Sequence, residues 1–188
     1  MEETKLYTIS AFSENNVGVL NQVTIIFTRR CINIESISAS ATAIPGVYKI
    51  TVVAKSTLSA MEKVVKQIEK RIEIIKAFLH TDDEIIYQEV ALYKVPTDKM
   101  LHESHLEGII RHHNARILEI TPDYTILEKT GHVDETEALF AELRRYGILQ
   151  FVRSGRAAVT KHPVEFVTNY LEQQAKIHPE WKKFVDGL

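Results

Sequence analysis

The chain has 188 residues, of which 45% are hydrophobic and 26% charged, and its formal net charge is -2. A chain of this length and composition buries about 70% of its unfolded surface in a core, which excludes disordered and collagen-like structure. The small net charge gives no attraction to nucleic acid. The seven glycines are never closer than eight positions apart, which excludes glycine-rich phosphate-binding loops.

The N-terminal residues and the one cysteine indicate a cytoplasmic protein. Residues 1–5 are acidic and lack the basic and apolar regions of a signal peptide. Cys31 has no second cysteine with which to form an intramolecular disulfide. No apolar run approaches the roughly 18 residues of a membrane span, so no contact with a membrane is expected.

The first half of the chain predicts the order strand, helix, strand, strand, helix, strand. Strands are indicated by period-two alternation and helices by apolar side chains three or four positions apart. Pro45 and Gly46 predict a hairpin turn between the second and third strands. The expected elements are a strand at Leu6–Phe12, a helix ending near Arg30, strands at Ile32–Ala41 and Val47–Ala54, a helix from about Ser56 to Ile72 and a strand at Ile74–Leu79.

The second half repeats this order at an offset of about 80 residues. Its expected elements are a strand at Tyr87–Val95, a helix at Leu101–Asn114, strands at Ala115–Thr121 and Tyr124–Thr130, a helix at Asp134–Tyr146 and a strand at Ile148–Arg153. Asp134 is the expected N-cap of the last helix and Gly147 its stop. We therefore predict an α+β protein of two tandem ferredoxin-like βαββαβ domains, residues 1–80 and 86–160, joined by a polar linker at Thr81–Glu84.

Residues 161–188 lie outside both repeats and predict a helical tail. Pro163 and Pro179 each suit the first turn of a helix, and Trp181, Phe184 and Val185 share one helical face. Two interpretations stay open at this point. The tail is either a cap packed on its own protein or a docking helix for a partner.

The sequence predicts no catalytic residue and no metal ligand. His102 and His105 are three positions apart on a predicted helix, whereas the zinc motif H-E-x-x-H places its histidines four apart. Val152 occupies the first glycine position of G-x-S-x-G around Ser154. His113 continues an apolar helix face and is expected to be a packing residue.

The loop Asn15–Gly18, between the first strand and the first helix, is the candidate binding site. The N–H groups and positive dipole end of a helix N-terminus bind carboxylates, and Gly18 allows a ligand to approach the backbone closely. The amides of Asn15 and Asn16, and of Asn33 before the second strand, supply further hydrogen bonds. This pattern fits an amino-acid-sized anion. The alternative is that Asn15 or Asn16 only caps the helix.

Two sets of motifs connect the chain with a known family. The first half contains ENNVGVL at residues 14–20 and NIES at 33–36, and the second half contains ITP at 120–122, YT at 124–125, TG at 130–131 and RSG at 153–155. They resemble, respectively, the N-terminal ACT domain and the C-terminal domain of the regulatory (small) subunit of acetolactate synthase, also called acetohydroxyacid synthase. The resemblance extends over residues 5–160.

The resemblance implies a non-catalytic regulator in the biosynthesis of valine, leucine and isoleucine. Members of this family bind the catalytic (large) subunit, raise its activity and mediate feedback inhibition by a branched-chain amino acid, usually valine. Thiamine diphosphate, flavin adenine dinucleotide (FAD) and magnesium belong to the catalytic subunit. No cofactor is therefore expected in this chain.

The resemblance also implies where the effector amino acid binds. Two ACT domains pair side by side as a homodimer, and the ligand lies at their interface. Carried over by position, one protomer contributes Asn15, Asn16, Val17, Gly18, Val19 and Leu20, and its neighbour contributes Asn33 and Ile34.

Two departures and three alternatives accompany this interpretation. Cys31 stands where the family has glycine, in a left-handed conformation that costs a side-chain-bearing residue roughly 1 kcal/mol, and the tail has no counterpart. An RNA-binding RRM domain is excluded because Val47–Ala54 lacks the stacking aromatic motif. An acylphosphatase-like enzyme is excluded because the first loop has no arginine. A stand-alone amino-acid-sensing ACT protein that regulates another enzyme remains as the alternative.

Overall fold

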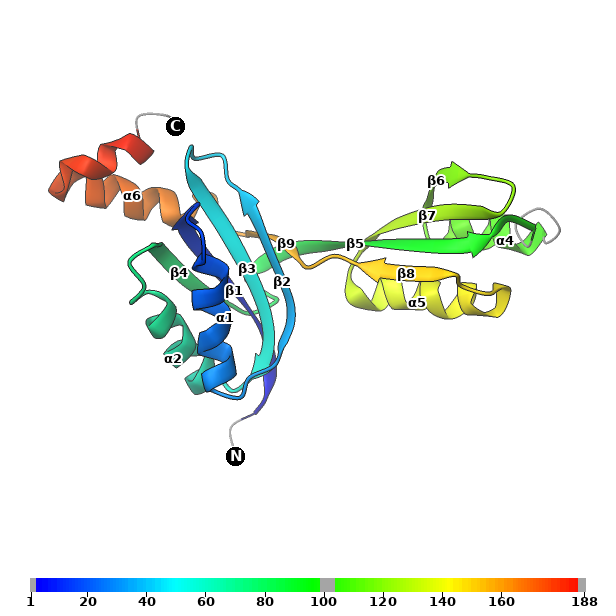
Figure 1. The fold of residues 1–188 in the computed structure, drawn as a ribbon, viewed down its shortest axis with the longest axis horizontal. Helices are drawn as coiled ribbons and strands as arrows, with labels where there is room; N and C mark the ends of the chain where they lie inside the picture. Colours follow the sequence, from blue (N-terminus) through cyan, green and yellow to red (C-terminus); the bar gives the residue numbers. More distant parts are fainter. Residues whose placement is uncertain (1–2, 99–103, 186–188) are drawn as a thin grey trace. The chain divides into compact units, whose positions relative to one another are not determined.

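The computed structural model describes residues 3–98 and 104–185, and the chain forms two compact units (Figure 1). The first unit contains the residues up to Ile86 together with those from Arg156 onward, and the second contains Tyr87–Gly155. The chain thus leaves the first unit once and returns to it. No helix in the described residues is both long and apolar enough to cross a membrane.

The first unit contains the predicted βαββαβ order. Its elements are β1 (Lys5–Glu14), α1 (Val19–Arg29), β2 (Ile34–Ala41), β3 (Val47–Ser56), α2 (Leu58–Ile68) and β4 (Ile74–His80). The four strands form an antiparallel sheet in the order β2-β3-β1-β4, which leaves β2 at one edge.

Strand alternation gives this sheet two different faces. Tyr7, Ile9 and Ala11 of β1 pack under α1 and α2 in the main core, together with Ile50 and Val52 of β3. The intervening residues of β1 point to the other face because successive side chains of a strand alternate. That second face buries polar side chains, namely Thr8, Ser10, Thr51 and His80. It therefore needs a cover of its own.

The tail supplies part of that cover. It contains α6 (Phe166–Ile177) and the short 3-10 helix η2 (Pro179–Phe184), and the strand β9 (Ala157–Thr160) precedes it. Val167, Leu171 and Phe184 are buried in a second apolar cluster with Phe12 of β1, Val47 of β3, Ile44 and Ile75. Of the two interpretations of the tail, the structure shows the packed one.

Polar contacts fix the start of the returning segment to the first unit. The Arg156 guanidinium is buried, and its Nη1 donates hydrogen bonds to Thr8 Oγ1 at 3.0 Å and to Asp82 Oδ1 at 2.7 Å. Lys161 Nζ donates to the carbonyl oxygen of Asp83 at 2.7 Å. For this reason residues 156–160, which the sequence placed in the second domain, belong to the first unit. The expected linker at Thr81–Glu84 is part of the same contact.

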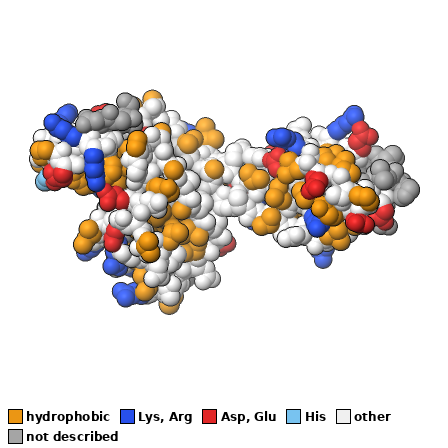
Figure 2. Space-filling model, turned by 45° about the horizontal axis from the view of Figure 1, so that its top comes forward, with side chains coloured by type: hydrophobic (Ala, Val, Ile, Leu, Met, Phe, Trp, Pro, Cys, Tyr) orange, Lys and Arg blue, Asp and Glu red, His pale blue; other side chains and the backbone are white. Residues whose placement is uncertain are grey.

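The second unit repeats the topology. Its elements are β5 (Ile85–Pro96), α4 (Ser104–His112), β6 (Arg116–Ile120), β7 (Tyr124–Gly131), α5 (Val133–Leu143), the 3-10 helix η1 (Arg144–Tyr146) and β8 (Gln150–Arg153), with the strand order β6-β7-β5-β8. Its core includes Tyr93, Ile109, Ile110, Leu127 and Leu139. Hydrophobic side chains are exposed on both units (Figure 2), among them Ile117, Leu118 and Ile120 of β6.

The structure corrects several details of the helices. The N-cap of α5 is His132, which forms a capping box with Glu135, whereas Asp134 lies inside the helix. Gly147 ends η1 with a positive φ of 85°, as expected of a stop. In the tail, Pro179 occupies the first turn of η2, but α6 begins at Phe166 rather than at Pro163.

The second helix is shorter than its apolar pattern indicated. It ends at Ile68, and the expected last member of its stripe, Ile72, is 98% exposed. Glu69 follows the helix, and its Oε1 accepts a hydrogen bond from the N–H of Ala77 and an ion pair from Lys76 at 2.6 Å. These contacts favour a turn at this point over another helical turn. Leu101 and His102, at the expected start of the fourth helix, lie outside the described residues.

Candidate functional site

The loop before α1 presents backbone rather than capping side chains. Gly18 is the N-cap residue, with φ of 89°, and no side chain forms a cap hydrogen bond. The N–H of Asn16 donates to Glu14 O at 3.0 Å, and the N–H of Val19 donates to Asn16 O at 3.4 Å. The helix-cap interpretation of Asn15 and Asn16 is therefore wrong. Their amide groups are free of that role and lie in an exposed loop.

The residues that follow differ in what they offer a ligand. Val17 is fully exposed and Leu20 is nearly half exposed, so both present apolar surface beside the loop. Val19 instead points into the main core, so only its backbone is available. The N–H groups of the first helical turn have no acceptor within the helix, as at every helix N-terminus. The loop thus combines N–H donors, two amides and an apolar rim, which fits a small carboxylate.

The other predicted residues lie at the far end of the same sheet. Asn33 is exposed just before β2, and Ile34 is half-buried against the main core. Ile34 is in register with Ala54 of β3, which pairs with Tyr7 near the start of β1. The loop follows Glu14 at the opposite end of β1. A single chain therefore does not bring the two groups of predicted residues together.

The chain between α1 and β2 is shaped by a left-handed residue. Cys31 has φ of 53°; its N–H donates to Thr28 O at 3.0 Å, and the N–H of Ile32 donates to Phe27 O at 3.1 Å. This is the Schellman pattern that ends many helices, in which glycine is favoured at the left-handed position. The second unit uses the same device after α4, where Asn114 has φ of 50°. The conformation expected at Cys31 is therefore present without glycine.

The other chemical candidates have structural roles. His113 Nε2 lies 3.1 Å from Glu142 Oε1 and the His113 side chain is largely buried, as expected of a packing residue. Ser154 Oγ accepts a hydrogen bond from the N–H of Val90 and donates to Gly155 O. Within the described residues, no three His, Cys, Asp or Glu side chains form a group that could hold a metal ion. His102 and the side chain of His105 lie outside them.

Sequence reasoning missed two features. Arg156, which follows the last predicted strand, and Asp82, from the predicted linker, form an ion pair at 2.7 Å. A cavity lies on the second face of the first sheet, between strands and tail residues more than 70 positions apart. The only sequence signal for the cavity is weak: Ser10 is a polar residue at a strand position that alternation assigns to solvent.

Comparison with known proteins places both units in one family. A family described as "AHAS small subunit-like ACT domain" matches residues 9–76, and one described as "Small subunit of acetolactate synthase" matches residues 88–162. An acetolactate synthase small subunit of Mycobacterium bovis is 30% identical over 159 residues, covering 85% of this chain and 94% of that protein. That of Bacillus subtilis is 34% identical over 148 residues, covering 78% of this chain and 86% of that protein.

The chain belongs to the acetolactate synthase small-subunit family. It is thus a regulatory, non-catalytic subunit of acetolactate synthase in branched-chain amino acid biosynthesis, and as a small subunit it associates with the large subunit. Family membership overturns the alternative of a stand-alone ACT protein. The crystal structure of the Thermotoga maritima small subunit shares the fold, with a TM-score of 0.76 at 24% identity over 85% of this chain and 99% of that one. Helix α6 and η2 lie beyond residue 162, where both family matches have ended.

Proposed function

We propose that this small subunit raises the activity of the catalytic subunit and mediates feedback inhibition by a branched-chain amino acid held between two ACT domains. The observation that carries the proposal is the exposed loop Asn15–Gly18, whose amides cap nothing and whose backbone opens onto a helix N-terminus. Such a site favours the carboxylate of an amino acid. The exposed side chains of Val17 and Leu20 provide apolar contact for its side chain.

The homodimer is proposed to form through strand β2, which lies at one edge of the sheet. Among the described residues it pairs with β3 alone, so its other edge has unpaired backbone groups. Strand edges of this kind pair with another copy or are protected. Side chains along β2 are largely exposed or half-exposed, including Ile37 near its middle. Antiparallel pairing of two β2 strands about a two-fold axis would extend the sheet across both copies.

The register of the sheet makes such a dimer suited to the effector. The end of β2 at Ala41 is in register with Tyr48, beside the end of β1 that leads into the loop. In antiparallel pairing, the Ile34 end of one β2 lies beside the Ala41 end of the other. The neighbour's Asn33 and Ile34 then lie at the end of the sheet where the loop is, which a single chain cannot achieve. The dimer therefore completes a site that each chain holds only in part.

We propose no cofactor site in the small subunit itself. We assign thiamine diphosphate, FAD and magnesium to the catalytic subunit, in keeping with the non-catalytic character of the family. The small subunit acts on that chemistry only through its contact with the large subunit.

Substitution of Gly18 tests the effector site. Gly18 has φ of 89°, and a Cβ built there meets no heavy atom within 4 Å, so a side chain is strained but does not clash. Asp and Asn both tolerate left-handed backbone better than other residues, and they differ in charge. We expect Gly18→Asp to remove valine inhibition of the reconstituted enzyme by repelling the ligand carboxylate, while activation is retained. Gly18→Asn is the matched control and retains inhibition. Full inhibition of the Asp variant would show that the site is placed wrongly.

Substitution of Ile37 tests the dimer. A two-fold axis near the middle of β2 brings the two Ile37 side chains close, so Ile37→Lys places two like charges together and weakens the dimer. Analytical ultracentrifugation measures the change. Ile72→Lys is the control because Ile72 is fully exposed in the same unit. Equal dimerisation of both variants would place the dimer interface elsewhere.

A further inference from the structure

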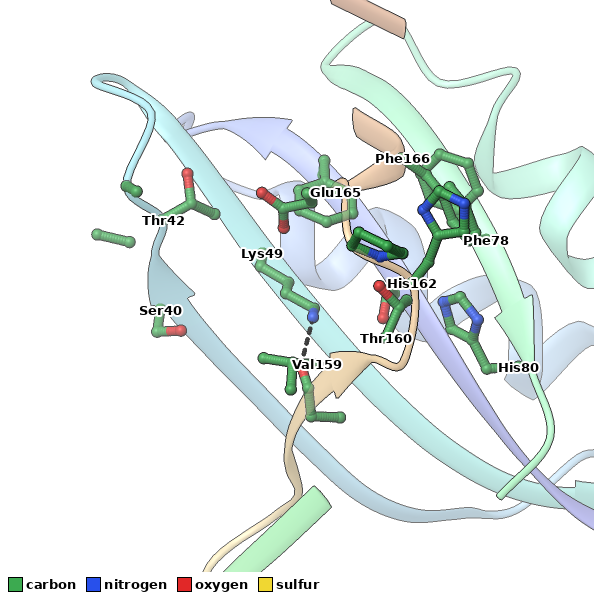
Figure 3. Close-up of a pocket in the computed structure, with 16 residues that line it drawn as sticks. Ser40, Thr42, Lys49, Phe78, His80, Val159, Thr160, His162, Glu165 and Phe166 are labelled. Carbon is green, nitrogen blue, oxygen red and sulfur yellow. Dashed lines mark hydrogen bonds between the residues drawn. The ribbon is translucent and has the colours of Figure 1, made fainter. Parts of the chain in front are cut away.

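A cavity of about 410 Å³ lies on the second face of the ACT sheet, on the side away from α1 and α2 (Figure 3). Its floor is formed by Ser10 and Phe12 of β1, Lys49 of β3 and His80 of β4. Its wall is formed by residues of β9 and of the start of the tail, between Ala158 and Phe166. The volume is within the range of about 300–1,000 Å³ typical of small-molecule sites. This site contains no residue of the effector loop, and its lining includes Ser40 and Ala41 at the end of β2.

Two largely buried polar side chains line this cavity without a hydrogen bond to any other residue that the structure describes. His80 is 4% exposed and Ser10 is 3% exposed. Among the described residues, the contacts of the His80 side chain are ring contacts with Phe78 and Phe166. Burial lowers the pKa of His80, which keeps the imidazole neutral with one donor and one acceptor nitrogen. The Ser10 hydroxyl and the His80 imidazole are not among the fully enclosed polar atoms, so both reach the cavity and can form hydrogen bonds with a ligand or with solvent there.

One positive and one negative side chain face the same space. Lys49 Nζ donates to Ala158 O at 2.5 Å, which uses one of its three donors. Burial lowers the pKa of Lys49, and the charge of Glu165 opposes that shift. Figure 3 shows the Lys49 and Glu165 side chains directed into the cavity, with His162 at its rim. With His80 neutral, the charges of Lys49 and Glu165 cancel, which favours a zwitterion over a phosphate or other strong anion.

The rest of the cavity is aromatic. Phe78 and Phe166 lie 5.5 Å apart between ring centroids, and the His80 ring stacks on Phe166 at 6.5 Å. Phe12 closes the same wall, with its ring 6.1 Å from Phe78. Such a surface binds a short apolar side chain through contact area. Apolar walls with a few convergent polar groups are the usual design of small-molecule sites.

We propose that this cavity binds a small apolar α-amino acid, with its carboxylate on Lys49 and Ser10, its ammonium group on Glu165 and its side chain against Phe12, Phe78 and Phe166. The tail is part of the site because Glu165 and Phe166 line the cavity. Both residues lie beyond the two family matches. The chain would then carry a second amino-acid site in each ACT unit. Tail docking and occupancy of this site are linked because the tail forms part of its wall.

Calorimetry on the full chain separates this site from the effector loop. The probe is L-valine, and the Gly18→Asp variant removes binding at the loop. We expect that variant to retain one valine site per chain, and Lys49→Gln added to it to weaken binding at least tenfold. Lys55→Gln is the matched control, a lysine exposed on the same strand, and binds as before. Ser10→Ala, expected to weaken binding several-fold, replaces Lys49→Gln if the latter does not fold.

Valine analogues test the zwitterion. 3-Methyl-2-oxobutanoate lacks the ammonium group and isobutylamine lacks the carboxylate, and both are expected to bind Gly18→Asp at least tenfold more weakly than valine. Absence of valine binding to Gly18→Asp at millimolar concentration would overturn the cavity site while leaving the loop intact. Equal binding of Gly18→Asp and its Lys49→Gln derivative would also overturn it. Oxo-acid binding as tight as valine binding would overturn the amino-acid assignment.

Discussion

Replacement of Leu171 by alanine measures how strongly the tail is held to the first unit. Leu171 of α6 is fully buried in the cluster that joins the tail to the sheet through Phe12, Val47 and Ile75. The substitution removes three carbon atoms, worth about 0.8 kcal/mol each in transfer free energy, or about 2.4 kcal/mol. The unfilled cavity adds to this, as in other buried leucine-to-alanine changes. We expect the free energy of unfolding to fall by about 3 kcal/mol.

Equilibrium unfolding in urea measures this change in stability, with tryptophan fluorescence as the probe of the tail. Trp181 is the one tryptophan of the chain, and its ring lies 6.1 Å from Tyr170 and 6.0 Å from Phe184, so its fluorescence reports on the tail. Far-UV circular dichroism reports on the whole fold. Ile177→Ala is the control at the end of the same helix, where the side chain is 69% exposed, and should change stability by less than about 0.5 kcal/mol. Equal effects of the two substitutions would refute a tail packed on the sheet.

Three further predictions concern stability. Arg156→Met should cost about 2–3 kcal/mol, because it removes a buried guanidinium that bonds to Thr8 and the half-exposed Asp82, while loss of the exposed Arg116 ion pair costs under about 1 kcal/mol; urea midpoints compare the two. Burial lowers the pKa of His80, so below about pH 6.5 the unfolded chain binds more protons than the folded one and stability falls as pH falls. Relative to wild type, His80→Gln should show a smaller loss of stability between pH 7.5 and 5.5, and an identical loss would contradict the buried neutral imidazole. Glu135→Ala removes the capping box of α5 and should cost about 1 kcal/mol in thermal unfolding; no change would show that the cap contributes nothing.

The order of the elements could be predicted because apolar residues recur with the period of a strand or of a helix along each half of the chain. Tyr7, Ile9 and Ala11 occupy every second position of β1 and face the helices that cover the sheet. Val23 and Phe27, four positions apart, lie on the buried side of α1. These are local patterns, and they survive in the folded protein. Helix ends were less predictable, since α2 stops at Ile68 under the influence of Glu69 contacts made from β4.

The second face of the sheet could not be predicted from local patterns. Thr8 and Ser10 alternate with apolar neighbours, a pattern that predicts a solvent-exposed face of the sheet, but both side chains are buried. The cover comes from Arg156 and the tail, about 150 positions further along the chain. Its apolar contacts, such as Phe12 with Leu171, follow only from the tertiary arrangement.

The candidate effector loop was predictable in its position and not in its detail. Turn chemistry and Gly18 marked the start of α1, and the structure bears this out. The sequence did not indicate that Val19 faces the core or that Asn33 lies at the other end of the sheet. Both depend on strand register, which pairing across β3 determines.

Activity of the catalytic subunit titrated with this chain, with and without valine, tests the central claim most directly. The proposal predicts that activity rises to a plateau at a fixed ratio of the two subunits and that valine then inhibits the complex but not the catalytic subunit alone. Gly18→Asp should give the same plateau without the inhibition. A wild-type titration that leaves the activity and its valine response unchanged would contradict the regulatory role proposed for this chain.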